Sequence, residues 1–360
     1  MNPSMDIRSF LEQSRRLPIV DVRSPGEYDK GHIPGAINIP LFDDRERAAV
    51  GTTYGEAGRE QAVAQGLQFV APRMTDLAAE MLHVADPHDP HLLLHCWRGG
   101  MRSQSMAWLA NQARCRVTLL DGGYKAFRQH VLQSFAQPLN LVVLSGLTGA
   151  GKTGQLLQLR AAGEQVIDLE QLARHRGSAF GGIGLGGQPT VEQFENELFD
   201  ELQRLDPKRR VWLEDESRKI GTVILPNDFY VQLKQAPAIF LEVDVDTRAR
   251  IIADEYSHLP QLQLLYSINR ITKRLGGQNA SAARHALQAG DIRGCIRILL
   301  DYYDRTYMVA KTKISRDVFI HISVEDPSSP HSTRQILQTA SGESFGMTST
   351  SHIPQPVSSD

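Results

Sequence analysis

The stretch VDVRSPGEYDKGHIPGAINIPL, residues 20–41, begins in an apolar run and continues through glycines and prolines. We expect a buried β-strand at residues 17–23, because a short apolar run bounded by turn-forming residues is typical of a strand covered on both faces. Similar runs predict strands at residues 91–96 and 116–123, with a helix at residues 103–113. This alternation predicts an α/β domain that ends near residue 135.

A second α/β unit is expected after residues 134–140, where a proline interrupts the preceding helical pattern. Its predicted strands lie at residues 139–146, 164–170, 210–216, 237–245 and 317–324, and its predicted helices at residues 191–205, 247–256 and 259–275. Strands that alternate with helices favour a mostly parallel sheet, here of the P-loop NTPase-like kind. The expected division is therefore a first domain at 1–136, a second at 137–325, and a disordered Ser-, Thr- and Pro-rich tail at 326–360.

The composition is that of an ordinary globular protein, with 360 residues, 41% hydrophobic and 22% charged. A net charge of -2 gives no bulk attraction to nucleic acid, so any RNA contact would need a local basic face. We find no apolar segment of the kind that marks a signal peptide or a membrane helix. Three cysteines are too few for a disulfide framework, so we expect a cytoplasmic protein without membrane or DNA partners.

The second predicted strand leads into HCWRGGMRS, residues 95–103, where an arginine follows Cys96 by six positions. A glycine-rich loop of this length can curl so that its backbone N–H groups face an anion, and a helix beginning near Ser103 would add its positive end. These features favour the thiolate of Cys96, the species that attacks phosphorus, sulfur or selenium. A buried cysteine that only ends a strand is the alternative. The candidate anion-binding residues are Arg98, Gly99, Gly100 and Arg102.

The other two cysteines are expected to have no catalytic role. Cys295 recurs at helical spacing with apolar neighbours, which predicts a place in a hydrophobic core. Cys115 adjoins a predicted strand without a glycine-rich loop. Either could resolve an oxidised Cys96.

Residues 20–41, the cysteine loop and LDGGYKAF at 120–127 together resemble the rhodanese domain over residues 5–135. The resemblance implies that Asp21 and Arg23 are structural and that His32 shapes a turn. Sulfurtransferase rhodaneses commonly place an arginine or threonine five positions after the cysteine, whereas the six-position spacing here resembles rhodanese-fold phosphatases. The loop by itself therefore leaves phosphatase and transferase chemistry open.

GLTGAGKT, residues 146–153, matches the phosphate-binding pattern G-x-x-x-x-G-K-[ST] in full. It lies between an apolar strand and a predicted helix, which is the context that the motif requires. The lysine would neutralise a phosphate and the threonine would ligate Mg²⁺, but the motif does not identify the phosphate-bearing molecule. The residues expected to bind phosphate are Gly146, Gly149, Gly151, Lys152 and Thr153.

Acidic residues follow two predicted strands of the second unit, where they orient a metal ion or face solvent. The glycine-rich segment 175–190 carries basic and hydroxyl groups at its head, as expected of a loop that closes over a ligand or of a flexible linker. Glu214 is one of the carboxylates that would orient a metal ion, and Lys219 would contact an anion or face solvent. The remaining candidates are Asp168, His175, Arg176, Ser178, Asp215, Glu216 and Arg218.

Basic residues gather at 208–210 and within 269–285. On helices they are either solvated faces or contacts to RNA. The RNA-contact candidates are Arg270, Lys273, Arg274 and Arg284.

A rhodanese-like domain ahead of a P-loop domain, with HRGSAFG, QPTVEQFEN and EDESRKIG, resembles the tRNA 2-selenouridine synthase family over residues 5–325. This resemblance implies a tRNA substrate with a 2-thiouridine derivative at the wobble position of its anticodon. It implies that the sulfur receives a geranyl group from geranyl diphosphate, and that selenium from selenophosphate then replaces the S-geranyl group. Cys96 would serve selenation, its loop would bind selenophosphate, and residues 146–153 would bind the geranyl diphosphate. No tightly bound cofactor is expected, the requirement for Mg²⁺ stays open, and a selenophosphate-supplying enzyme is an expected partner.

Three other functions remain open from the residues alone. A cysteine phosphatase would hydrolyse aryl phosphates without tRNA. A kinase or an ATP-using sulfurtransferase would turn over nucleotide at residues 146–153. A non-enzymatic tRNA-binding or redox-sensing protein would tolerate replacement of Cys96 by serine.

Overall fold

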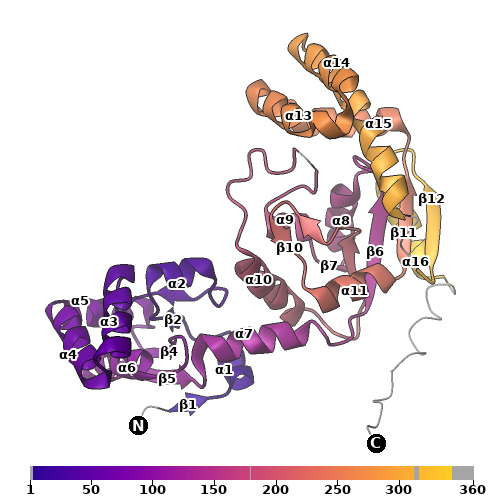
Figure 1. Cartoon of the computed structure of the whole chain (residues 1–360). Coiled ribbons are helices and arrows are strands. Elements are labelled where there is room, and N and C mark those ends of the chain that lie inside the picture. Colours follow the sequence, from indigo (N-terminus) through magenta and orange to yellow (C-terminus); the bar gives the residue numbers. More distant parts are fainter. Residues whose placement is uncertain (1–2, 179, 312–315, 343–360) are drawn as a thin grey trace, which may run out of the picture. The chain divides into compact units, whose positions relative to one another are not determined.

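The computed structural model describes residues 3–178, 180–311 and 316–342, which divide into two compact units (Figure 1). The first unit holds Met1–Phe135 and Glu192–Asp200, and the second holds Ala136–Val191 and Glu201–Asp360. Most of helix α10 (Val191–Gln203) therefore belongs to the first unit, although the residues before and after that segment belong to the second.

The first unit is built on a five-stranded sheet with the order β1-β5-β4-β2-β3, in which every pair is parallel. The strand order reverses at β4, and the carboxyl end of a parallel strand at such a switch point is where α/β proteins bind ligands. The strands are β1 (Ser4–Met5), β2 (Ile19–Asp21), β3 (Ile37–Asn38), β4 (His91–His95) and β5 (Arg116–Leu120).

Helices cover both faces of this sheet. Leu92, Leu94 and Val117 point to the face covered by α5 and α6, where they join one hydrophobic core. Helices α1 and α7 pack together, and α7 contacts β5. The helices are α1 (Ile7–Gln13), α2 (Pro25–Lys30), α3 (Asp44–Glu56), α4 (Arg59–Val70), the short 3₁₀ helix η1 (Ala71–Arg73), α5 (Met74–Val84), α6 (Met101–Gln112) and α7 (Gly123–Ser134).

The second unit has its own parallel five-stranded sheet, with the order β12-β11-β6-β8-β7, and a short antiparallel ribbon. Strand order again reverses at one strand, β6, which leads into the GLTGAGKT loop. The sheet strands are β6 (Leu141–Gly146), β7 (Gln165–Val166), β8 (Val211–Glu214), β11 (Ala238–Glu242) and β12 (Phe319–Ser323), and the ribbon is β9 (Lys219–Ile220) with β10 (Val223–Ile224).

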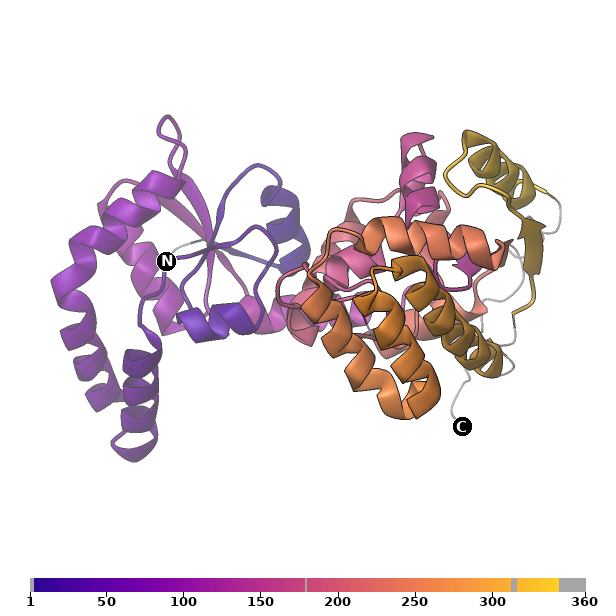
Figure 2. The same ribbon diagram turned by 90° about the horizontal axis from the view of Figure 1, so that it is seen from above.

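Hydrophobic clusters among the described residues of the second unit include the following two. One joins the sheet to α8 and α16 around the fully buried Trp212, and the other lies among α12, α13, α14 and α15, which pack against one another (Figure 2). The helices are α8 (Lys152–Ala161), α9 (Leu169–Ala173), α11 (Asn227–Gln235), α12 (Val245–Tyr256), α13 (Gln261–Leu275), α14 (Gly277–Gln288), α15 (Ile292–Lys311) and α16 (Pro330–Ala340). Within the described residues, every helix is too short or too polar to cross a membrane.

Most predicted elements are present with shifted ends, for reasons that lie in single residues. The predicted strand 164–170 ends at Val166, because the Asp168 carboxylate accepts a hydrogen bond from the Gln171 N–H at 2.8 Å and so caps α9. The predicted strand 116–123 ends at Leu120, since Gly122 and Gly123 take positive φ angles of 70° and 59° and start α7.

The predicted disordered tail at 326–360 is wrong for residues 330–340, which form α16 with Ile336 fully buried. The serine and threonine hydroxyls that suggested disorder are instead hydrogen-bonded inside the protein. The Ser332 hydroxyl donates to the Asp326 carbonyl at 2.8 Å, and the Thr333 hydroxyl donates to Gln155 Oε1 at 2.9 Å. The rest of the predicted tail, residues 343–360, lies outside the described residues.

Candidate functional site

Cys96 follows β4 at the switch point of the first sheet, and its side chain is only 3% exposed. Its thiol donates a hydrogen bond of 3.3 Å to the Ser103 hydroxyl, which donates to the Gly100 carbonyl at 2.9 Å. Helix α6 begins at Met101, so Ser103 lies in its first turn, where the partial positive charge of the helix favours an anion. The sequence did not single out Ser103 as the partner of the thiol.

Backbone hydrogen bonds from the start of α7 hold the loop after Cys96 in place. The Tyr124 N–H donates to the Cys96 carbonyl at 2.9 Å and the Lys125 N–H donates to the Trp97 carbonyl at 3.0 Å, so two carbonyls that would repel an anion are engaged by α7. A Cβ atom on Gly123 would lie 2.6 Å from the Gly99 nitrogen and would collide with the Cys96 carbonyl. Only glycine therefore allows this approach of the two backbone segments.

The two arginines of the loop have different surroundings. Arg98 is exposed, whereas Arg102 forms a two-pronged ion pair with Glu27, with 2.5 Å from Nη1 to Oε2 and 3.2 Å from Nη2 to Oε1. Burial alone would raise the pKa of Glu27, but the Arg102 guanidinium outweighs it and lowers the pKa. The sequence did not single out Glu27. Its carboxylate pairs with the Arg102 guanidinium, whose positive charge we expected to face an anion.

A buried ion pair underlies the loop. The guanidinium of Arg23 binds both carboxylate oxygens of Asp21 and donates to the Gly31 carbonyl at 2.7 Å, and the two residues are 1% and 0% exposed. The Arg23 guanidinium carbon also lies 3.7 Å from the centre of the Tyr124 ring. His95 is fully buried beside Asp21, and this burial lowers its pKa. These contacts fit the structural role expected of Asp21 and Arg23.

Helix α10 completes the first unit on the other side of Tyr124. The Tyr124 hydroxyl donates to Glu192 at 2.9 Å and accepts from Asn196 at 2.8 Å, while Asn196 also donates to the His32 carbonyl at 2.8 Å. The ring of His32 stacks on Tyr28 at 3.9 Å, in the turn where we expected it. Residues 192–196 of the segment QPTVEQFEN therefore belong to the first unit, whereas Gln188 at its start donates to the Ala173 and Ile220 carbonyls of the second unit.

In the second unit, the GLTGAGKT loop joins β6 to α8 in the expected strand–loop–helix arrangement. The Lys152 ammonium folds back to donate to the Gly146 carbonyl at 3.0 Å. Gly149 has a φ of +80°, and a Cβ there would lie 2.7 Å from Ile252 and 2.9 Å from the Arg248 carbonyl, so the loop packs directly against α12. Arg248 supports the loop by donating to the Thr148 carbonyl at 3.1 Å.

The loop lines one side of a pocket of about 760 Å³, which we call the phosphate pocket. The pocket brings together many residues that are far apart in the sequence. Its lining includes the predicted site residues Gly146, Gly149, Gly151, Lys152, Thr153, Asp168, Arg176, Ser178, Glu214, Asp215 and Glu216. Three predicted residues are not part of this lining: the His175 N–H bonds to the Glu170 carbonyl, and Arg218 and Lys219 are exposed, before and in the β9–β10 ribbon.

Buried carboxylates line the phosphate pocket beside the loop. Glu214 is 2% exposed, and its Oε1 accepts from the Glu170 N–H at 2.9 Å while its Oε2 has no hydrogen-bond partner among the described residues. Burial, followed by the charge of Glu216, raises the pKa of Glu170 to about 8. Sequence reasoning missed Glu170, although it closely follows β7 at the same sheet edge as Asp168.

Asp215 differs from its neighbours, because it is locked into a polar network. It accepts a hydrogen bond of 2.8 Å from Ser145, and its other oxygen lies 2.7 Å from both Lys234 and Arg316. These two cations lower the pKa of Asp215 despite its burial. Asp215 is therefore an ionised structural carboxylate.

The residues around the phosphate pocket do not form a preformed metal cage. Among the described residues, no group of three or more His, Cys, Asp or Glu side chains is placed to hold a metal ion. The Thr153 hydroxyl lies 3.4 Å from Glu170 instead. The Mg²⁺ role expected of Thr153 stays a prediction.

The predicted RNA-contact residues lie on two neighbouring helices. Arg270, Lys273 and Arg274 are exposed on α13, outside the stripe of its buried residues, and Arg284 of α14 donates to Asn269 at 3.2 Å. In contrast, Arg210 pairs with a glutamate and packs over Trp212, so the cluster at 208–210 is partly structural.

Cys115 and Cys295 are both buried, and burial raises the pKa of each thiol, to about 11 for Cys295. Cys295 packs in the core formed by α12–α15, as its spacing predicted.

Comparisons with known proteins match both units. The model of the rhodanese-like domain family matches residues 6–130, and that of the tRNA 2-selenouridine synthase AAA domain matches residues 139–327. The relatives include proteins named tRNA 2-selenouridine synthase over most of their length. That of Shewanella denitrificans is 36% identical over 340 residues, covering 85% of this chain and 90% of the relative. That of Bordetella petrii is 35% identical over 345 residues (84% and 89%), and that of Shewanella loihica is 38% identical over 328 residues (81% and 86%).

Proposed function

The chain belongs to the tRNA 2-selenouridine synthase family, and from this membership we propose that it converts 2-thiouridine in tRNA to 2-selenouridine. The observation that carries the proposal is that two glycine-rich loops, each between a parallel strand and the start of a helix, occur in one chain. The loop after Cys96 and the loop at residues 146–153 each follow the switch-point strand of their own parallel sheet. The proposed reaction has two anionic donors, geranyl diphosphate and selenophosphate, and we assign one loop to each.

The first step uses the phosphate pocket. Geranyl diphosphate binds with its diphosphate against Lys152 and the N–H groups of residues 146–153. The sulfur at C2 of the wobble uridine attacks the geranyl carbon that bears the diphosphate. The carbon–oxygen bond breaks, diphosphate leaves with the electron pair, and the uridine N3–H releases its proton to solvent. Lys152 stabilises the negative charge that develops on the leaving group.

The second step uses the loop after Cys96. Selenophosphate binds there, its phosphoryl oxygens facing the N–H groups at the start of α6 and the charges of Arg98 and Arg102. Its selenium attacks C2, the geranyl thiolate leaves and takes a proton from water, and hydrolysis of the selenium–phosphorus bond releases phosphate. Cys96, at the base of this loop, lies against the reacting anion. A separate enzyme that phosphorylates selenide would supply this donor.

The tRNA anticodon region contacts the basic face of α13, formed by Arg270, Lys273 and Arg274, together with Arg284 of α14. This face supplies the local positive charge that the net charge of the chain lacks.

The test combines the protein with thiolated tRNA, geranyl diphosphate and selenophosphate, followed by digestion of the tRNA and mass measurement of its nucleosides. Geranylated and selenated uridine are the expected products. Cys96→Ser should abolish selenation and keep geranylation, with Cys115→Ser as the matched control. Lys152→Ala should abolish geranylation, with Lys208→Ala as the control.

Three outcomes would contradict the proposal. Absence of both modified nucleosides would refute the function itself. Unchanged geranylation by Lys152→Ala would refute the division of labour between the two loops. Release of phosphate from aryl phosphates without tRNA, or a requirement for ATP, would favour phosphatase or nucleotide chemistry instead.

A further inference from the structure

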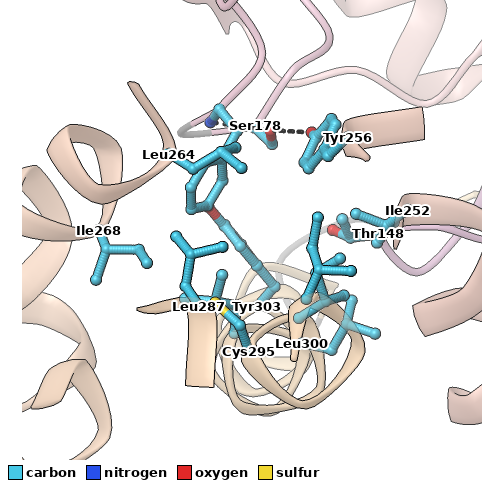
Figure 3. Close-up of a pocket in the computed structure, with 14 residues that line it drawn as sticks. Thr148, Ser178, Ile252, Tyr256, Leu264, Ile268, Leu287, Cys295, Leu300 and Tyr303 are labelled. Atoms are coloured by element: carbon cyan, nitrogen blue, oxygen red, sulfur yellow. Dashed lines mark hydrogen bonds between the residues drawn. The ribbon is translucent and has the colours of Figure 1, made fainter. Parts of the chain in front are cut away.

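A second cavity lies among the helices of the second unit, beside the phosphate pocket (Figure 3). We call it the tail cavity, and its volume is about 30 Å³. Figure 3 shows aliphatic side chains and a cysteine directed into it from α13, α14 and α15. Its lining residues are Thr148, Ser178, Phe180, Ile252, Tyr256, Leu264, Ile268, Leu287, Ile292, Cys295, Ile296, Leu299, Leu300 and Tyr303.

The tail cavity and the phosphate pocket share a wall. Five residues line both, namely Thr148, Ser178, Ile252, Tyr256 and Tyr303. Thr148 belongs to the GLTGAGKT loop itself, and Gly149 of the same loop packs against Ile252. A ligand whose phosphates lie on the loop therefore has an apolar cavity next to its other end.

The chemistry of the wall selects an apolar group. Where the two spaces meet, the hydroxyls of Ser178 and Tyr256 lie 3.2 Å apart and hydrogen-bond to each other, so they are not aimed at a ligand (Figure 3). Deeper in, Leu287, Cys295 and Leu300 are buried and offer no strong hydrogen-bonding group. Apolar cavities of this kind stay dry and take up hydrocarbon groups.

We propose that the tail cavity receives the hydrocarbon end of the prenyl diphosphate donor, and that Leu287 and Cys295 set the chain length that the enzyme accepts. This inference rests on the proposed function, because it concerns the donor of that reaction. It adds where the hydrocarbon chain of the donor lies and which residues limit the length of that chain.

The size of the cavity limits how much of the donor chain fits without movement of side chains. Its 30 Å³ is about one fifth of the roughly 150 Å³ of an engineered cavity that holds benzene. The cavity thus accepts the end of a chain, and a ten-carbon chain must displace neighbouring side chains such as Leu264. Each methylene that becomes buried strengthens binding about fourfold, so affinity depends steeply on how much of the chain enters.

The experiment uses the full chain and measures binding by calorimetry and transfer to thiolated tRNA. The probes are inorganic diphosphate and the C5, C10 and C15 donors dimethylallyl, geranyl and farnesyl diphosphate. Cys295→Phe fills the cavity and should weaken geranyl diphosphate binding at least tenfold, with binding of inorganic diphosphate unchanged within twofold. Leu287→Ala enlarges it and should raise the farnesyl-to-geranyl ratio of kcat/KM at least tenfold.

Leu233→Ala is the matched control, since Leu233 is fully buried in α11 and does not line the tail cavity. It should keep the donor preference of the wild type, and thermal melts of all variants report whether each is folded. Cys295→Met is a milder filling variant in case the phenylalanine prevents folding.

Two results would overturn the assignment. One is wild-type protein that binds geranyl diphosphate no tighter than inorganic diphosphate, whatever the transfer assay gives. The other is a wild type that transfers geranyl while folded Cys295 and Leu287 variants keep its donor preference. Failure of the proposed function has a different signature, because geranyl diphosphate would then bind more tightly than inorganic diphosphate and more weakly to Cys295→Phe, while no tRNA would be modified.

Discussion

Replacing Glu170 with glutamine should stabilise the second unit at neutral pH and leave it unchanged in acid. Burial, followed by the charge of Glu216, raises the pKa of this carboxyl to about 8, against an ordinary value of 4.5. Such a group is protonated in the folded protein and ionised in the unfolded chain over the range between these values. Unfolding then releases a proton, so rising pH favours the unfolded state.

The magnitude follows from the two pKa values. Below pH 4.5 both states are protonated and Glu170 has no effect on the free energy of unfolding. Above it, the folded state loses about 1.4 kcal/mol for each pH unit until the pH approaches 8. The loss is therefore about 1 kcal/mol at pH 5 and about 3 kcal/mol at pH 7. Glutamine keeps the shape of the side chain and removes the ionisation.

Urea denaturation between pH 5 and pH 8 measures the effect. Trp212 in β8 reports on the second unit once Trp97 and Trp108 are replaced by phenylalanine in all proteins compared. The stability gained by Glu170→Gln should grow from about 1 kcal/mol at pH 5 to about 3 kcal/mol at pH 7. Glu325→Gln, at an exposed position of the same unit, should show no such growth.

A gain that does not change with pH would refute this reasoning. It would mean that Glu170 is ionised in the folded protein, with the nearby Lys152 compensating fully for its burial. A loss of stability at pH 7 would refute it as well, since it would make the carboxylate a net stabilising group.

Three further predictions concern other parts of the molecule. Asp21→Asn leaves Arg23 buried without its carboxylate and should lower the unfolding free energy of the first unit by about 3–5 kcal/mol in a urea titration; a loss below about 1 kcal/mol would contradict the structural role of the pair. Glu27→Gln frees Arg102 from its partner and should lower the KM for selenophosphate severalfold in the selenation assay, whereas an unchanged KM would show that Arg102 only anchors Glu27. Ile336→Ala should lower the unfolding free energy of the second unit by about 2–5 kcal/mol, measured by Trp212 fluorescence in urea. An unchanged stability would indicate that α16 is not packed on the core and that the prediction of a disordered tail was right.

Much of the fold is predictable because parallel strands buried on both faces are continuous apolar runs. Residues 91–96, 210–216 and 237–245 have this pattern, and each contains a sheet strand. The C-terminal helix was missed for the opposite reason. Its core contact depends on Ile336 and a few neighbours, while Ser332 and Thr333 are buried through hydrogen bonds that composition does not reveal.

The site was predictable where one continuous segment forms it. The glycines and Lys152 of residues 146–153 were placed correctly in strand–loop–helix context, because the local backbone conformation determines that arrangement. The roles of residues whose neighbours come from distant segments of the chain were not predicted. Glu170 acquires its raised pKa from burial and then from the charge of Glu216, and Arg102 is engaged by Glu27, a residue 75 positions away in the sequence.

The path of the backbone through the first unit limits how the gene can be cut. The chain crosses between the units three times, after Phe135, Val191 and Asp200. A truncated gene that stopped at residue 135 would encode a first unit in which the Tyr124 hydroxyl lacks Asn196 and Glu192. Transfer of this rhodanese-like half to another protein would require that the recipient protein supply a helix equivalent to α10. Gene recombination is therefore expected to exchange the two halves together.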